Sequence, residues 1–281
     1  MANYYNLITG LPDLLLGEGK PSYSVCEFRD VCNELLTEAD KRIIHYFFLK
    51  YDCLNVARLL KDPEADVTLP GNLTAEQCRD LIEQADEMNT EVPHGAPAFL
   101  MKFILDYPEM KEKAGFFVED AVLGEYYRYA MQCGHPQVAS WFELNFNITN
   151  ILTAFIARNY GWQVENYVLD ANEVSDAILK NVQARDFGLA PLIDYVEDII
   201  RIAECEDPVQ KEKRIDAFKW VWLDENTFFE PFSIASVFAY LCKLDMSERW
   251  EKLDIEVGRE TFTQIVDNLR GEARVPDEFK K

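Results

Sequence analysis

The segment from Phe142 to Gly161 constrains the fold more than any other, because it reads as a helix with two packing faces. Residues 142–161 spell FELNFNITNILTAFIARNYG. Asn147 or Thr149 can cap the start of this helix through a short polar side chain, and Gly161 can end it. One face has large, mostly apolar side chains: Ile148, Ile151, Leu152, Phe155 and Asn159. The other face has small residues: Asn150, Ala154, Ala157 and Gly161. The pattern predicts a central helix of an all-helical fold.

The composition is that of a folded, strongly acidic protein. The chain has 281 residues, of which 48% are hydrophobic, and its formal net charge is -22. That length suffices for a substantial core, in one large domain or in two to three lobes. The negative field repels phosphate backbones and anionic lipids, so we expect protein partners and no nucleic acid. A cationic partner surface and an acidic surface that serves only solubility remain the two alternatives.

Cysteine usage and hydropathy indicate a cytoplasmic protein. The seven cysteines are an odd number without a CxxC pair, which favours reduced core residues over a disulfide framework or a zinc site. The longest apolar runs fall short of the eighteen or so residues of a membrane span, and MANYYNLITG has no basic region before an apolar core. We therefore expect no transmembrane segment.

Helix start signals recur along the chain. Ser24 with Glu27 and Thr74 with Gln77 match the capping box, and Asp207 before Pro208 matches an N-cap followed by proline. The predicted helices cover residues 24–36, 38–61, 74–89, 96–106, 119–133, 136–161, 172–185, 189–205, 208–222, 232–250 and 256–270. Residues 4–9 and 163–169 contain β-formers but have no hairpin partner, so an all-α, multi-lobed helical bundle with little or no sheet is expected.

The loops indicate one packed unit. Residues 1–281 are expected to form a single all-helical unit of two to three packed lobes, with junctions near 62–72, 89–97 and 161–170, where glycine, and in the first two proline, concentrates. Because these loops are not Gly/Ser linkers, the lobes should pack against one another.

A weak internal similarity links two of the predicted helices. Asp52 precedes Asn55 by three residues, and Asn147 precedes Asn150 by three, 95 residues further on. In both places the Asn, Asn55 or Asn150, stands at the start of an apolar run with helical spacing. A duplicated helical unit and coincidence both explain this pattern.

Motifs of catalysis and ligand binding fail on inspection. The run Gly17-Glu-Gly-Lys20 lacks the first glycine and the Ser or Thr of a phosphate-binding loop, because Leu14 and Pro21 occupy those places. Glu91 and His94 have the spacing of a di-iron motif, but Pro93 lies between them and there is no second copy. We expect no enzyme activity, no catalytic residue, no cofactor and no metal.

Two segments resemble the C-type component of V/A-type rotary ATPases, the counterpart of the d-type component of the eukaryotic enzyme. The residues of the first segment that fit its recurring signature are Asn147, Asn150, Ile151, Thr153, Ala157, Arg158 and Gly161, while Ile156 departs from it. The second is similar to the family's C-terminal helix, through Pro231, Phe232, Ile234, Val237, Ala239, Tyr240, Leu241, Lys243 and Asp245. Both sets are interpreted as structural residues rather than contacts.

The whole chain also resembles a bacterial family of uncharacterised proteins whose sequences begin with a segment similar to residues 4–12. The members of this family are encoded among the components of V-type rotary ATPases. The chain is shorter than usual for the C-type component and its first third matches poorly, so Asp52 and Asn55 would be the remnant of a first repeat.

The resemblance implies a non-catalytic part of the central stalk that couples the rotor shaft to the membrane ring during proton or sodium transport. Its partners would be the shaft and ring proteins of the ATPase, at the cytoplasmic face of the membrane, with acidic side chains of this chain meeting basic ones. The alternative is an acidic helical scaffold or assembly adaptor unrelated to rotary ATPases. An enzyme with a buried carboxylate site would need a convergent polar pocket.

Overall fold

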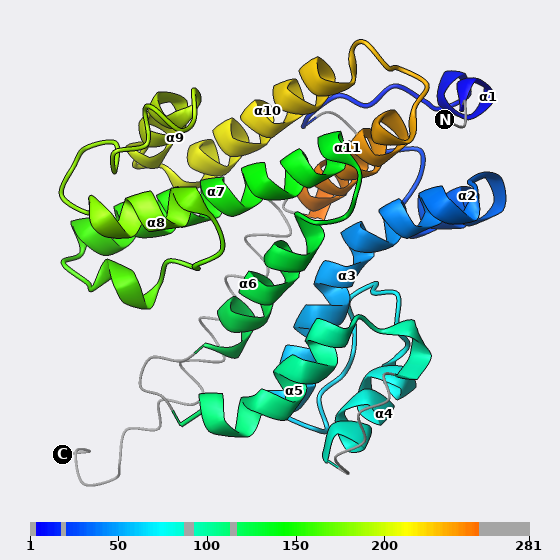
Figure 1. The fold of residues 1–281 in the computed structure, drawn as a ribbon. Helices are drawn as coiled ribbons and strands as arrows, with labels where there is room; N and C mark the ends of the chain where they lie inside the picture. Colours follow the sequence, from blue (N-terminus) through cyan, green and yellow to red (C-terminus); the bar gives the residue numbers. More distant parts are fainter. Residues whose placement is uncertain (1–3, 18–20, 87–92, 113–116, 253–281) are drawn as a thin grey trace, which may run out of the picture.

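The computed structural model describes residues 4–17, 21–86, 93–112 and 117–252. These residues fold into helices joined by turns and loops (Figure 1), and no strand occurs among them, so the all-helical prediction is confirmed. The helices are α1 (Tyr5–Thr9), α2 (Val25–Leu35), α3 (Glu38–Lys61), α4 (Ala75–Asp86), α5 (Ala98–Met110), α6 (Val118–Ala130), α7 (Pro136–Asn159), α8 (Glu173–Lys180), α9 (Val196–Ala203), α10 (Pro208–Thr227) and α11 (Ile234–Lys252). Short 3-10 turns lie at Pro93–Gly95 and Val164–Asn166.

The local start signals act as predicted. Ser24 and Glu27 form a reciprocal capping box at the start of α2, and Thr74 and Gln77 exchange the same pair of hydrogen bonds at α4. Asp207 accepts from the backbone amides of residues 209 and 210 at the start of α10. These signals need only neighbouring residues, which is why the sequence reveals them.

The predicted caps at Asn147 and Thr149 are wrong. Helix α7 begins well before them, at Pro136, so both residues lie in its middle. The Thr149 hydroxyl donates to the Asn145 carbonyl one turn back, 2.8 Å away. Asn147 is buried and contacts other elements instead. Gly161 does follow the end of α7, in the left-handed conformation at φ 70°.

Two predicted helices are shorter in the structure, and Arg158 contacts the segment between them. Helix α8 ends at Lys180 and α9 begins at Val196, whereas the sequence predicts 172–185 and 189–205. The Arg158 guanidinium donates to the carbonyls of Val182 and Ala184, 3.2 and 2.6 Å away, and lies over the buried Phe187 ring. This tertiary contact fixes the turns just after α8, and Asp186 accepts from the amides of Gly188 and Ala190 in the next turn. The β-formers near the N-terminus lie in helix α1, which agrees with the expected lack of sheet. The predicted helix 256–270 lies outside the described residues, as does the end of 74–89.

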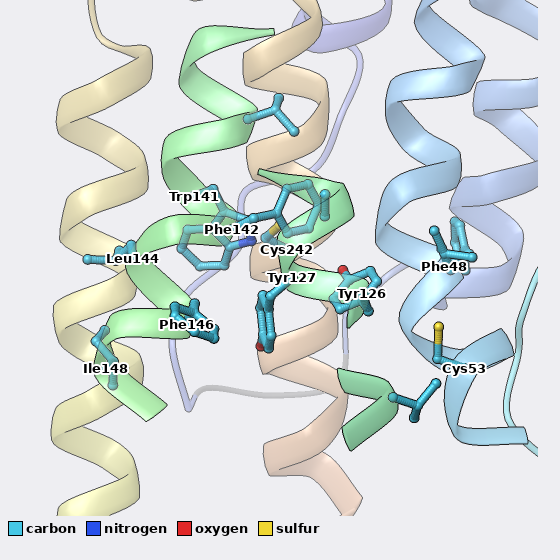
Figure 2. Close-up of a cluster of buried hydrophobic side chains, with 14 of the residues drawn as sticks. Phe48, Cys53, Tyr126, Tyr127, Trp141, Phe142, Leu144, Phe146, Ile148 and Cys242 are labelled. Carbon is cyan, nitrogen blue, oxygen red and sulfur yellow. The ribbon is translucent and has the colours of Figure 1, made fainter. Parts of the chain in front are cut away.

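The buried side chains of the described helices form one continuous core. Figure 2 shows its centre, where aromatic rings of α6 and α7 meet residues of α3 and α11. The residues labelled there are Phe48, Cys53, Tyr126, Tyr127, Trp141, Phe142, Leu144, Phe146, Ile148 and Cys242. All seven cysteines lie in the described part of the chain and none is disulfide-bonded. The small residues Ala154 and Ala157 of α7 and Ala239 of α11 are buried. The division into lobes stays a prediction.

Among the described helices, none combines the length and the apolar character that crossing a bilayer requires.

Candidate functional site

The loop after α3 is fastened to that helix by two buried polar side chains. The Asp52 carboxylate, 1% exposed, accepts from the Leu73 amide and from Asn72 Nδ2, each at 2.8 Å. One turn along, the Asn55 carboxamide donates to the Leu69 carbonyl and accepts from the Leu69 amide, at 3.0 and 3.4 Å. Because buried polar groups must be hydrogen-bonded, these contacts fix the path of the loop. We call this arrangement the α3 clamp.

Helix α7 fastens its own following loop in the same way. Asn150 donates to the Leu169 carbonyl at 2.8 Å and accepts from the Leu169 amide at 3.0 Å. Asn147 Oδ1 accepts from Asn172 Nδ2 at 2.8 Å, while its own Nδ2 donates to the Tyr195 hydroxyl at 3.1 Å. We call this arrangement the α7 clamp.

The two clamps are equivalent in construction. Their helix residues are 95 positions apart, and their loop residues, Leu69 with Asn72 and Leu169 with Asn172, are 100 apart. Each loop then enters a capped helix, α4 or α8. The internal similarity thus corresponds to two helix–loop–helix units, and in the second unit the clamped loop residues lie five positions further along the chain from the helix residues. A repeated Leu-x-x-Asn in both loops would have revealed this from the sequence.

Charge distinguishes the α3 clamp from the α7 clamp. Burial raises the pKa of Asp52 from 3.8 to about 6. The hydrogen bonds from Leu73 and Asn72 and the charge of Arg29 lower this pKa, but burial has the larger effect. Arg29 lies over the Phe48 ring and donates to the Gly71 carbonyl at 2.9 Å. At the equivalent place α7 has the neutral Asn147. One clamp therefore titrates and the other does not.

A hollow lies beside each clamp at matching helix positions. The hollow beside the α3 clamp has a volume of about 450 Å³, and the one beside the α7 clamp about 580 Å³. Arg42, His45, Leu49 and Asp52 line the first, and Ser140, Glu143, Leu144 and Asn147 line the second. Burial and the Arg29 charge lower the pKa of His45. The first hollow thus combines the Arg42 guanidinium with the Asp52 carboxylate, and the second has the carboxylates of Glu143 and Asp194.

The other signature residues hold structure together at two separate places. On α7, Thr153 is half-buried, Ala157 is buried, and Arg158 and Gly161 shape the loops that follow. On α11, the Tyr240 hydroxyl donates to the Pro12 carbonyl at 3.1 Å, and Phe232 stacks edge-on against Tyr5. Ala239 is buried in α11, while Pro231 is exposed just before it. The α11 set therefore fastens the N-terminal segment.

Metal-binding clusters of three or more His, Cys, Asp or Glu side chains are absent from the described residues. Among the described residues, the two clamps and their hollows bring several polar groups together.

The fold and these sites define an all-helical protein built on a pair of clamped helix–loop–helix units. Over residues 1–273 the chain matches the family described as "Protein of unknown function (DUF2764)", and it belongs to that family. No curated protein and no solved structure matches it significantly.

Proposed function

We propose that the protein is a non-catalytic part of the central stalk of a V/A-type ATPase or ATP synthase, which couples the rotor shaft to the membrane ring. The resemblance of residues 147–161 and 231–245 to the C-type component of these enzymes is the starting point. The observation that carries the proposal is the pair of equivalent clamps. The signature asparagines Asn147 and Asn150 fasten a loop, and Asp52 and Asn55 do the same 95 residues earlier.

A coupling protein must transmit force without deforming, and two features suit that task. The core is continuous through the described helices, and the loops after α3 and α7 are fixed by buried side-chain hydrogen bonds. Close-packed interiors have low compressibility and transmit strain. The formal charge of -22 would complement basic surfaces on a shaft or on the loops of a ring.

Co-purification tests the proposal. The chain, tagged at its chromosomal locus, is recovered from gently solubilised membranes of the cell that encodes it, and its partners are identified by mass spectrometry. We expect shaft and ring proteins of a rotary ATPase, released as salt is raised because exposed charge pairs are screened. A stable complex lacking both kinds of protein would contradict the proposal and support the scaffold or adaptor alternative.

A further inference from the structure

A continuous groove runs between α7, the loop at residues 190–195, and the second half of α10. It consists of the 580 Å³ hollow beside the α7 clamp and an adjoining one of about 440 Å³. The two hollows share the lining residues Asp194, Tyr195, Trp222 and Asn226. We call it the α7–α10 groove.

Apolar and aromatic side chains form much of the groove wall. Leu192 and Val221 are 45% and 54% exposed, and Tyr195, Phe218 and Trp222 are half-buried beside them. The Tyr195 and Phe218 rings are 5.8 Å apart. Large side chains that are both apolar and accessible in a concave surface are typical of a binding site.

The groove carries negative charge. Its lining includes the carboxylates of Glu143, Asp194, Asp198 and Glu225, and among the described residues that line it there is neither Lys nor Arg. Of these carboxylates, Asp198 pairs with Arg201. Burial first, and then the charges of Glu143 and Asp194, raise the pKa of Tyr195. Glu143 and Asp194 are therefore close enough to the Tyr195 hydroxyl to influence it.

This charge is local and not an average of the acidic surface. The hollow beside the α3 clamp has the Arg42 guanidinium at its edge as well as the Asp52 carboxylate. The hollows beside the two equivalent clamps thus differ in charge, since only the first has an Arg in its lining. The difference points to different partners for the two hollows.

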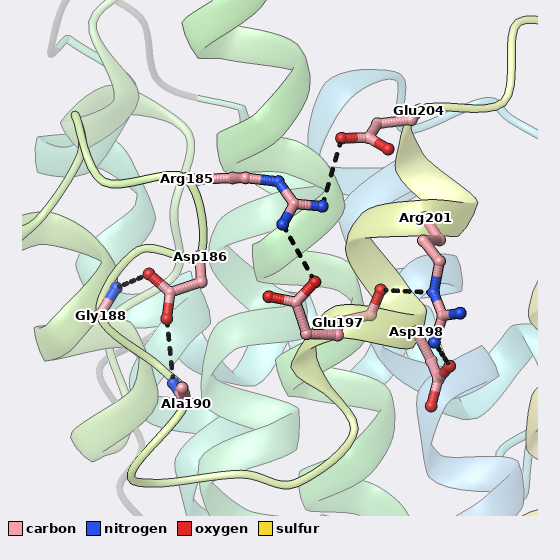
Figure 3. A network of polar contacts seen from close by, with 8 residues as sticks. All are labelled: Arg185, Asp186, Gly188, Ala190, Glu197, Asp198, Arg201 and Glu204. Carbon is pink, nitrogen blue, oxygen red and sulfur yellow. Dashed lines mark hydrogen bonds and ion pairs between the residues drawn. The ribbon is translucent and has the colours of Figure 1, made fainter.

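The loop wall of the groove is held in place before any partner binds. Figure 3 shows Asp186 accepting from the amides of Gly188 and Ala190, at 3.0 and 3.3 Å, just before that wall. In the same view Arg185 bridges to Glu197 and Glu204 of the α9 region. The Tyr195 hydroxyl accepts a hydrogen bond from Asn147 of α7. Because a fixed site loses little conformational entropy on binding, this arrangement favours affinity.

We propose that the α7–α10 groove binds a Lys/Arg-rich amphipathic segment of a partner protein. The apolar stems and any Leu or Val side chains of the segment would pack on Leu192 and Val221, and its cationic groups would meet Glu143, Asp194 and Glu225. A Lys or Arg over Trp222 or Tyr195 would add a cation–π contact. A second copy of this chain is disfavoured by like charge, since residues 253–281 are also net acidic. The inference rests on the groove alone, so it stands or falls separately from the central-stalk proposal.

Fluorescence polarisation with the full-length protein tests this. The probe is a labelled helix-forming peptide of Leu and Lys, with Lys on one face; two further peptides replace all Lys by Glu, or all Leu by Ser. Neutralising the groove with E143Q, D194N and E225Q should weaken binding about tenfold or more at about 0.15 M salt. The matched control, E64Q, E76Q and E83Q, removes the same charge from exposed positions at and near α4 and should change affinity less than about twofold.

A second pair of variants guards against misfolding. L192S and V221S remove exposed apolar contacts without changing charge, and should also weaken the Leu/Lys peptide while leaving the melting temperature unchanged. The proposal would be overturned if the groove variant and the control variant at α4 lost the same affinity for the Leu/Lys peptide. It would also be overturned if the Glu peptide bound as tightly as the Leu/Lys peptide. Leu/Lys binding unchanged by L192S with V221S, or an affinity that depends on self-association of the protein, would overturn it as well.

Discussion

At the scale of residues, the two clamps differ by one functional group at matching positions of α3 and α7. Asp52 presents a carboxylate where Asn147 presents a carboxamide, and both are 1% exposed. A buried carboxylate loses its hydration, so it prefers the protonated form more than it does in water. The same position can therefore tie stability to pH in one unit and leave it independent of pH in the other.

The pH dependence follows from the raised pKa of Asp52. Because the folded pKa, about 6, exceeds the ordinary value of 3.8, the contribution is fully present below pH 3.8 and is lost as pH rises through 6. The unfolding free energy of the wild type relative to D52N should fall between pH 4 and 7, by up to about 3 kcal/mol. Urea unfolding at both pH values measures it.

The mirror-image variant supplies the control. N147D places the carboxylate in the α7 clamp and should create a similar pH dependence there. If the difference between D52N and the wild type is the same at pH 4 and pH 7, burial of Asp52 does not have the assigned effect.

Gly71 is required by the close approach of its loop to α3. A Cβ at this position would lie 2.1 Å from Asp52 Oδ1 and 3.1 Å from the Asp52 backbone nitrogen. Gly71→Ala should therefore displace the loop from the α3 clamp and destabilise the protein by about 1 to 3 kcal/mol in urea unfolding.

Gly124→Ala is the matched control. A Cβ there would meet only the Leu169 side chain, at 3.6 Å, within helix α6. Because Ala favours a helix over Gly, this variant should be neutral or more stable by up to about 1 kcal/mol. Equal destabilisation by both substitutions would contradict the clamp geometry.

At the scale of elements, α3 and α7 are long helices that each determine the course of the loop after them. The carboxamides of Asn55 and Asn150 each pair with both the amide and the carbonyl of one loop residue, as a neighbouring strand does in a β-sheet. The helix that follows, α4 or α8, is thereby positioned relative to its parent helix. Residues that the sequence suggests as caps and signature positions thus act as connectors.

Removing a clamp should release its loop selectively. Asn150→Ala leaves the Leu169 amide and carbonyl without their partner, which should cost on the order of 2 kcal/mol or more in unfolding free energy. Hydrogen exchange should accelerate at the Leu169 amide and not at the Leu69 amide. Asn55→Ala should reverse that pattern.

Thr149→Ala provides the control on the same helix. Its side chain is exposed and bonds within its own helix, so the expected change is within about 0.5 kcal/mol. Exchange at the Leu169 amide that is unchanged in Asn150→Ala would show that the hydrogen bonds do not hold the loop.

The small-residue faces lead to an overpacking prediction. Ala154 on α7 and Ala239 on α11 are buried, at 0% and 4% exposure. Replacing either by Leu should lower the unfolding free energy by about 1 to 3 kcal/mol. Ala98→Leu, at an exposed position of α5, should have little effect. An unchanged melting temperature for both buried variants would mean that these faces are not packed.

Local chemistry explains which elements the sequence can predict. The starts of α2, α4 and α10 depend on caps within four residues, and the sequence predicts them correctly. The apolar residues just before α9 also have helical spacing, yet they are not helical. The segment that precedes them is bound by a distant residue, because Arg158 of α7 donates to its carbonyls. The α7–α10 groove depends on three elements far apart in the chain, so no sequence pattern reveals it.

At the scale of the whole molecule, an acidic chain with one continuous core presents both acidic and basic side chains at defined places. The net charge of -22 favours cationic partners, yet the Arg42 guanidinium lies at the hollow beside the α3 clamp. Rigidity between such surfaces is what a coupling part would need. The central-stalk proposal therefore concerns force transmission and not chemistry.

The most direct test is ATP-driven ion uptake into inverted membrane vesicles from the cell that encodes the chain, with and without its gene. We expect vesicles lacking the protein to retain ATP hydrolysis by the catalytic head but to lose ion uptake, and the purified protein to restore uptake. Vesicles that lack the protein and pump ions at the wild-type rate would contradict a coupling role.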